Sequence, residues 1–319
     1  MELINYFDKF LVDTVNLNKS RIDKLNEKEI ILRDFIKASD NFKNIYKDMQ
    51  QQGSLSQKTI IKPATDSKGF DADLALMLEK NPKWEAKDYL IELHKIFKEN
   101  GNYKDIVSLG TRNVKIDYSG VFHVDIVPCL ENPPQYLICN WVANQYENDN
   151  PIGFKNWLFE KNGYSNGHLI KTIRLIKYLR DIKTNFSVKS ILLNTLLGER
   201  IIFNDNIADF KNLPTTLLTL FKRLNLFLQN NSSMPVILNP VLKSEDLTIR
   251  NWDKDKYSNF RDKIKLYCGK VEDAHNEKDK EKSIEKWQLV FGDEFPSKVD
   301  QPKADQAIAS NTNSRPWSY

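Results

Sequence analysis

Cysteine is scarce in this sequence, with three residues in a chain of 319. Cys129, Cys139 and Cys268 form no C-x-x-C pair, and an odd number cannot be fully paired within one chain. This argues against a disulfide framework and against a cysteine zinc site, and it favours buried thiols. The chain also starts with an acidic segment, MELINYFD, that lacks the pattern of a secretory signal peptide. Together these features predict a cytoplasmic protein.

Long apolar runs and a strong charge of one sign are absent too. No segment approaches the ~18 consecutive apolar residues that a membrane span needs, so we expect no membrane partner. The net charge is +4, whereas proteins that bind nucleic acid polymers usually carry a heavier basic excess. We therefore expect no requirement for polymeric nucleic acid. A hydrophobic content of 40% and the length of the chain allow two modest domains.

Three carboxylates carry the strongest chemical signal. Asp71 and Asp73 alternate with apolar residues in the segment FDADL, and side chains two apart on a strand point to the same face. Asp125 lies in a second apolar run, FHVDIVP, where an unpaired carboxylate would be costly unless that face is exposed. If the two runs are neighbouring strands, the three carboxylates gather, and they repel one another unless cations lie between them. This predicts a site for two Mg²⁺ ions of the kind that serves phosphoryl transfer.

An Asp-x-Asp sequence alone is a weak signal, because most examples lie at solvated strand edges, turns or helix starts. A Gly-Ser pair shortly before it, Gly53 and Ser54, strengthens the prediction. Glycine lets the backbone approach a phosphate closely, and a serine at the start of a helix offers an anion both its hydroxyl and its N–H.

These segments resemble the polymerase β-like nucleotidyltransferase superfamily, and within it the bacterial cGAS/DncV-like nucleotidyltransferases (CD-NTases). The resemblance covers QGS (52–54), FDADL (70–74), RNVKIDY (112–118), FHVDIVP (122–128), GHLIKTIRLIKYLRD (167–181), KSILLNTLL (189–197) and KWQLVFGDEFP (286–296). It implies an α+β fold, with a small mixed sheet flanked by helices, a C-terminal helical lobe and an active-site cleft between them. It also implies Mg²⁺-dependent synthesis of a cyclic di- or trinucleotide second messenger from nucleoside triphosphates, with release of pyrophosphate.

The resemblance implies further partners and contacts. The substrates would be ATP and other nucleoside triphosphates, Mn²⁺ could replace Mg²⁺, and the setting would be anti-phage defence with a regulatory protein as partner. Lys177 and Ser190 match positions that grip phosphates in the family. The alternatives are a solvated surface lysine and a serine that only caps its helix. Ile191 stands where some relatives have a tyrosine that stacks on a base, so base preference stays open.

Two other side chains near the aspartates have structural alternatives. His123 would share a face with Asp125, and we interpret it as a structural histidine beside the metal ligands rather than a general base. Arg112 could contact a phosphate, but a structural ion pair explains it equally well.

The chain divides by pattern into three parts. We expect a nucleotidyltransferase core over residues 1–160, a helical nucleotide-binding lobe over 161–298 and a disordered tail over 299–319. Helical spacing of apolar residues predicts helices within 1–50 and at 89–98, 190–197, 213–230 and 257–276. Strands are expected at 114–118, 122–128 and 135–139, with a hairpin turn at 117–120.

Two other functions remain open at this point. The same fold could transfer nucleotides to RNA ends or AMP to a protein. A non-enzymatic binding module could also retain the fold, although the presence of all three carboxylates argues against it.

Overall fold

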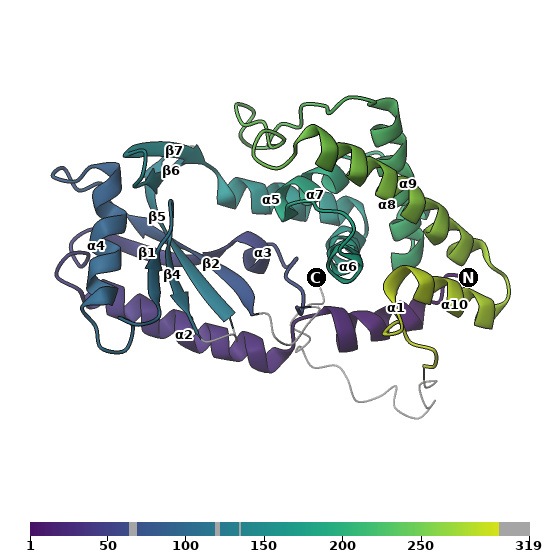
Figure 1. Cartoon of the computed structure of the whole chain (residues 1–319), viewed down its shortest axis with the longest axis horizontal. Helices are drawn as coiled ribbons and strands as arrows, with labels where there is room; N and C mark the ends of the chain where they lie inside the picture. Colours follow the sequence, from purple (N-terminus) through teal and green to yellow (C-terminus); the bar gives the residue numbers. More distant parts are fainter. Residues whose placement is uncertain (64–68, 119–121, 134, 300–319) are drawn as a thin grey trace. The chain divides into compact units, whose positions relative to one another are not determined.

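The computed structural model describes residues 1–63, 69–118, 122–133 and 135–299 (Figure 1). By contacts the chain divides into two compact units. One is the continuous segment Leu17–Asn156, here called the sheet unit. The other, here called the helical unit, combines Met1–Asn16 with the residues from Trp157 onward.

The sheet unit contains three helices and seven strands among its described residues. They are α2 (Lys19–Ala38), β1 (Tyr46–Gln52), α3 (Gly53–Ser56), β2 (Phe70–Leu78), α4 (Ala86–Lys98), β3 (Val107–Leu109), β4 (Val114–Asp117), β5 (Phe122–Asn132), β6 (Gln135–Asn140) and β7 (Gln145–Asp149). Helix α5 (Pro151–Tyr164) runs across the division between the two units.

The helical unit is built from the remaining elements. They are α1 (Ile4–Phe10), a π-helical segment (Leu11–Val15), α6 (His168–Lys183), α7 (Ser190–Gly198), a 3₁₀ turn (Ile207–Phe210), α8 (Leu213–Asn230), α9 (Lys254–Asn276) and α10 (Lys280–Phe291). None of the described helices is long and apolar enough to cross a membrane.

The described strands form one mixed sheet in the order β1-β2-β5-β4-β3. Strand β5 is long enough to pair with β4 along its first half and with β6 along its second half, and β7 pairs with β6. Only the central pair β2 and β5 is parallel among these contacts. The two strands at the centre of the sheet are therefore those that carry the predicted carboxylates.

One face of the sheet is buried under α2 and α4. Alternate residues of β2 supply much of this core, and all are buried: Phe70, Ala72, Leu74, Leu76 and Leu78. On β1, the Gln51 amide donates to Glu29 of α2 at 2.7 Å, which fixes α2 over this face. The rings of Phe35 on α2 and Phe97 on α4 lie 5.1 Å apart, so the two helices also pack together. Each large apolar side chain buried here stabilises the fold by ~1.5–3 kcal/mol. This leaves the other residues of β2 to face away from the core.

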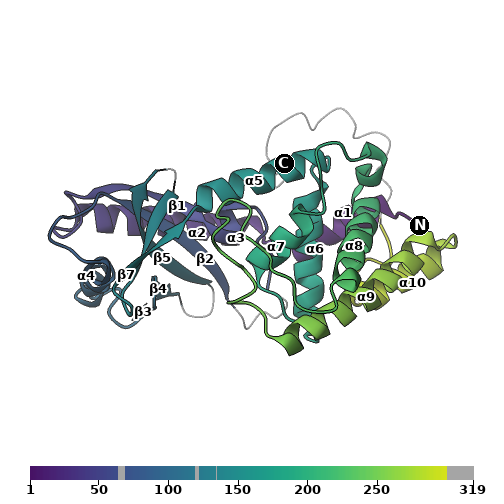
Figure 2. The same ribbon diagram turned by 90° about the horizontal axis from the view of Figure 1, so that it is seen from above.

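An aromatic cluster holds the first helix within the helical unit. Phe7 and Phe10 of α1 are fully buried against Trp287, Phe291 and Phe295, in and after α10. The centroids of Phe7 and Trp287 lie 4.8 Å apart with the rings nearly perpendicular, an arrangement that aromatic pairs favour. Figure 2 shows α9 and α10 lying side by side in this unit.

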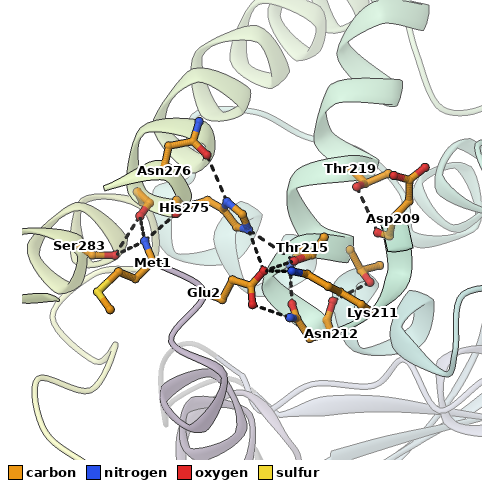
Figure 3. A network of polar contacts seen from close by, with 12 residues as sticks. Met1, Glu2, Asp209, Lys211, Asn212, Thr215, Thr219, His275, Asn276 and Ser283 are labelled. Carbon is orange, nitrogen blue, oxygen red and sulfur yellow. Dashed lines mark hydrogen bonds and ion pairs between the residues drawn. The ribbon is translucent and has the colours of Figure 1, made fainter. Parts of the chain in front are cut away.

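Polar contacts reinforce the same attachment (Figure 3). Glu2 accepts hydrogen bonds from Asn212 and Thr215 at the start of α8, at 2.8 and 3.0 Å. It also pairs with Lys211 at 2.7 Å. Burial opposes the ionisation of Glu2, but these partners outweigh it and lower the pKa of the carboxyl. The carboxylate of Glu2 is thus bound by residues that follow it by more than 200 positions in the sequence.

The predicted strands at 114–118, 122–128 and 135–139 correspond to β4, β5 and β6, and the helix predicted at 89–98 corresponds to α4. The antiparallel pairing of β4 with β5 agrees with the predicted hairpin, although residues 119–121 of its turn lie outside the described residues. The helices expected within residues 1–50 correspond to α1 and α2, whereas residues 46–50 belong to β1, a strand that was not predicted. With the polar sequence YKDMQQQ, this edge strand is specified by backbone pairing to β2 rather than by alternating apolar residues.

The predicted domain boundary after residue 160 stays a prediction. The division by contacts falls nearby, between Asn156 and Trp157, and it groups residues 1–16 with the later helices instead of with the sheet. The tail predicted at 299–319 lies outside the described residues except for its first residue.

Candidate active site

The site begins on β2, on the sheet face opposite α2. Asp71 is exposed and Asp73 is half-buried, while the residues on either side of them are buried in the core. The alternation that fills the core with Phe70, Ala72 and Leu74 therefore directs both carboxylates away from it.

The register of the central strands brings the third carboxylate alongside. Asp73 on β2 pairs with Asp125 on β5, and Asp71 pairs with His123. Because in-register residues of neighbouring parallel strands point to the same side, the three aspartates share one face of the sheet. The three residues that the sequence singled out therefore lie on one face of the two central strands, away from the apolar core.

Asp125 is more enclosed than Asp71, with a side chain that is 20% exposed against 65%. Its Oδ1 atom is buried and has no hydrogen-bond partner among the described residues. Burial raises the pKa of Asp125, and the nearby charge of Asp71 raises it further, whereas Lys115 and Asn113 oppose this shift. A buried oxygen that lacks a partner is a position where a cation would be stabilised.

Gly53 lies directly against Asp73. It follows β1, opens the short helix α3 and has a φ of +61°, a conformation that side chains other than hydrogen rarely adopt. A Cβ built at this position would lie 2.1 Å from Asp73 Oδ2. The predicted Gly-Ser pair is thus adjacent to the carboxylates, and Ser54 is half-buried in the first turn of α3.

Lys115 completes the cluster, and sequence analysis did not identify it. It lies on β4 as the register partner of Asp125. Its Nζ lies 3.7 Å from Asp125 Oδ1 and 3.8 Å from Asp71 Oδ1. The signal was available, because a hairpin centred on residue 120 pairs position 115 with position 125 and puts both side chains on one face.

The donor set suits a hard divalent cation. Carboxylate oxygens are the preferred ligands of Mg²⁺. A partnerless buried oxygen on Asp125 and a glycine that leaves room for the Asp73 carboxylate fit that use. As they stand, however, no three acidic, histidine or cysteine side chains of the described residues are gathered closely enough to hold an ion together. The ammonium of Lys115 lies between two of the acids instead.

Two neighbouring residues make structural contacts. His123 Nδ1 lies 3.2 Å from Asp117 Oδ1 on the adjacent strand, in agreement with the structural interpretation. Arg112 pairs with Glu147 at 2.7 Å, so the ion-pair alternative is confirmed for this arginine.

A pocket of about 100 Å³ continues the same face beyond the carboxylates. Ala75 and Met77 follow Asp73 along β2 with the same orientation and line this pocket, together with Gln52, Tyr136 and Lys155. No sequence motif pointed to it, because its lining comes from four separate segments.

Lys177 and Ser190 belong to the helical unit. Lys177 is 5% exposed, so the alternative of a solvated surface lysine is wrong, and Arg174 on the same helix is also buried. Arg174 donates to Asn16 at 2.6 Å, and burial lowers the pKa of its guanidinium to about 10. Ser190 is the first residue of α7 and Lys189 is the N-cap, which corrects the expected capping position by one residue. Their roles in binding phosphate stay predictions.

Comparison with known proteins identifies the family. Residues 1–162 match the family described as the Second Messenger Oligonucleotide or Dinucleotide Synthetase domain. The chain belongs to this family. It is a nucleotidyltransferase, and the predicted CD-NTase family and fold are confirmed.

Relatives span nearly the whole chain. A cyclic AMP-AMP-AMP synthase of Acinetobacter sp. is 21% identical over 305 residues, covering 93% of this chain and 87% of the relative. The structure of E. coli MS115-1 CdnC with ATP is 22% identical, has a TM-score of 0.72 and covers 93% of this chain and 100% of that chain. Vibrio cholerae DncV, a cyclic AMP-GMP synthase, has a TM-score of 0.73 at 13% identity, covering 92% of this chain and 96% of that chain.

Proposed function

We propose that this protein joins nucleoside triphosphates, ATP among them, into a cyclic di- or trinucleotide second messenger and releases pyrophosphate. Asp71, Asp73 and Asp125 would hold two Mg²⁺ ions, with Mn²⁺ as a substitute. The observation that carries this proposal is the pairing of Asp73 with Asp125 across the parallel strands β2 and β5. The close approach of Gly53 to Asp73 supports it.

The proposed reaction is an in-line displacement at the α-phosphorus. The 2′- or 3′-hydroxyl oxygen of the acceptor forms a bond to that phosphorus, the bond to the bridging oxygen breaks, and pyrophosphate leaves. Bound Mg²⁺ would lower the pKa of the attacking hydroxyl and offset the charge of the triphosphate. A second or third round closes the ring, and no covalent enzyme intermediate is needed.

The chain's own contribution would be positioning. The lack of a side chain at Gly53 leaves room for the Asp73 carboxylate, and Ser54 would offer a hydroxyl and an N–H to phosphate oxygens. Lys177 and Ser190 would contact the donor triphosphate from the helical unit. Such fixed charges and dipoles lower the barrier without reorganising during the reaction.

The cellular setting is proposed from the relatives. One solved relative, E. coli MS115-1 CdnC, is described in a complex with HORMA-deltaN; it covers 92% of this chain at 20% identity and a TM-score of 0.70. We propose an anti-phage role in the cytoplasm and a regulatory protein partner of the same general kind. The three cysteines are all buried and free, which suits a reducing compartment.

The test is a double substitution of the β2 carboxylates. Asp71→Asn with Asp73→Asn should lower product formation from an ATP, GTP, CTP and UTP mixture by about 1,000-fold or more, because the site loses two anionic ligands. Mass spectrometry would measure the product. The melting temperature of the variant protein would show whether it is folded. EDTA should abolish the wild-type product, and Mg²⁺ or Mn²⁺ should restore it.

A matched control lies at the far end of the same two strands. Glu79→Gln with Glu131→Gln removes two carboxylates bridged by Lys47, and it should leave turnover within about twofold of wild type. Near-wild-type turnover of the aspartate variant would contradict the proposal. Label from the nucleotides that appears on RNA ends or on protein would support the alternative activity instead.

A further inference from the structure

Lys115 stands between two of the three carboxylates. Its Nζ lies 3.7 Å from Asp125 Oδ1 and 3.8 Å from Asp71 Oδ1, and its side chain is 37% exposed. The antiparallel register of β4 with β5 puts Lys115 opposite Asp125, so strand pairing brings the ammonium to this face. The register therefore fixes Lys115 on the same sheet face as the two aspartates.

A second lysine in the sheet unit shows what an ordinary bridging ion pair looks like here. Lys47 spans Glu131 and Glu79 at the other end of β5 and β2, and its side chain is 38% exposed. It donates a hydrogen bond to Glu131 at 3.0 Å. Both contacts of Lys115 are longer than a hydrogen bond, and Asp125 Oδ1 is left without a hydrogen-bond partner among the described residues. Lys115 thus shares its charge between two acids without binding either one tightly.

Gathered carboxylates need positive charge between them. The described residues include no group of three acidic, histidine or cysteine side chains that could hold an ion together as they stand, and a single ammonium lies where two of the aspartates converge. We propose that Lys115 is a displaceable counter-cation, which keeps Asp71 and Asp125 close together until a divalent ion enters and the ammonium moves away. This inference rests on the proposed function, because it assumes that the aspartates are the metal ligands.

The proposal predicts competition between the side chain and the metal. A divalent ion must displace the ammonium of Lys115, and the positive charge of that ammonium repels the ion at short range. Lys115→Met keeps most of the length of the side chain and removes the charge. Its dissociation constant for Mn²⁺ should fall by about tenfold, which corresponds to about 1.4 kcal/mol. Lys115→Arg retains the charge and should keep an affinity close to that of the wild type.

The measurement is a titration of the full chain with Mn²⁺ in the absence of nucleotide, in which electron paramagnetic resonance reports the free ion. Lys47→Met is the matched control, because it removes a bridging lysine of nearly equal exposure from the same sheet. Its Mn²⁺ affinity should stay at the wild-type value. In a second readout, Mn²⁺ should raise the melting temperature of Lys115→Met more than that of the wild type.

The outcomes separate this inference from the proposed function. The counter-cation role would be overturned if Lys115→Met bound Mn²⁺ no more tightly than the wild type. It would also be overturned if Lys47→Met gained as much Mn²⁺ affinity as Lys115→Met. If Lys115→Met does not fold, Lys115→Gln, which also removes the charge, replaces it in the same Mn²⁺ titration. Retained turnover in the Asp71→Asn, Asp73→Asn variant would overturn the proposed function itself, whatever Lys115 does.

Discussion

The backbone of Gly53 lies so close to the Asp73 carboxylate that no Cβ atom fits between them. A Cβ at position 53 would lie 2.1 Å from Asp73 Oδ2 and 2.9 Å from the carboxyl carbon. The absence of a side chain at position 53 therefore leaves the space that the carboxylate occupies, and this close approach links the Gly-Ser segment to the acidic strand.

Replacing Gly53 with alanine should affect catalysis more than folding. The new methyl group would push the Asp73 carboxylate aside, and a misplacement of about 1 Å costs ~100-fold in turnover. The positive φ adds a destabilisation of ~1–2 kcal/mol. Product formation and thermal unfolding would be measured together. Gly101→Ala is the control, because no atom lies within 4 Å of its Cβ position. Equal turnover in the two variants would refute the link between Gly53 and Asp73.

Lys177 should affect nucleotide binding if it contacts the triphosphate. Lys177→Met removes a buried charge from α6 while keeping most of the side-chain volume. We expect KM for the donor nucleotide to rise by about tenfold, the effect of losing one charge-assisted contact. Lys171→Met, at a half-buried position on the same helix, is the control and should leave KM unchanged. An unchanged KM for Lys177→Met would assign this lysine a role in stability alone.

His168 should make the helical unit sensitive to mild acid. Burial, helped by the charge of Lys171, lowers the pKa of His168 from 6.5 to about 4. Between these two values the unfolded chain binds a proton that the folded chain does not, so the free energy of unfolding should decrease as the pH falls from 6.5 to 4. Urea unfolding at several pH values would measure this slope. His168→Gln should reduce it, and the remaining slope would come in part from His275, whose pKa is also lowered. An identical slope in the variant would show that His168 does not contribute.

Phe7 should matter for stability far more than its place near the start of the chain suggests. It is fully buried between Trp287, Phe291 and Phe295. Phe7→Ala should lower the free energy of unfolding by ~3–5 kcal/mol through the cavity it leaves. Ile4→Ala on the same helix is 43% exposed and should cost far less. Chemical unfolding of both variants would be decisive, and similar losses would contradict the packing described for α1.

Sequence patterns identified the acidic site because they followed rules of local geometry. Spacing by two put Asp71 and Asp73 on one face, and the apolar run around Asp125 marked a central strand; the register in β2 and β5 agrees with both. The strand β1 was not predicted, because a polar edge strand is specified by its partner's backbone and shows no periodicity of its own.

The burial of Lys177 and Arg174 was missed for a related reason. Charged residues on one side of a helix usually indicate a solvated face, but Arg174 and Lys177 are both buried here. Lys115 was missed because its importance depends on a register between strands. Patterns along the chain therefore predicted elements and faces, whereas contacts between distant segments required coordinates.

The discontinuous make-up of the helical unit affects how the protein is synthesised. Residues 1–16 leave the ribosome before the sheet unit, yet the side chains that enclose Phe7 belong to α10 and the residues just after it. The sheet unit is continuous from Leu17 to Asn156 and can fold while translation proceeds. The aromatic face of helix α1 therefore stays uncovered by these partners until α10 has been synthesised. A fragment that starts at Trp157 would lack this helix, so the helical unit could be produced alone only if residues 1–16 were joined to it.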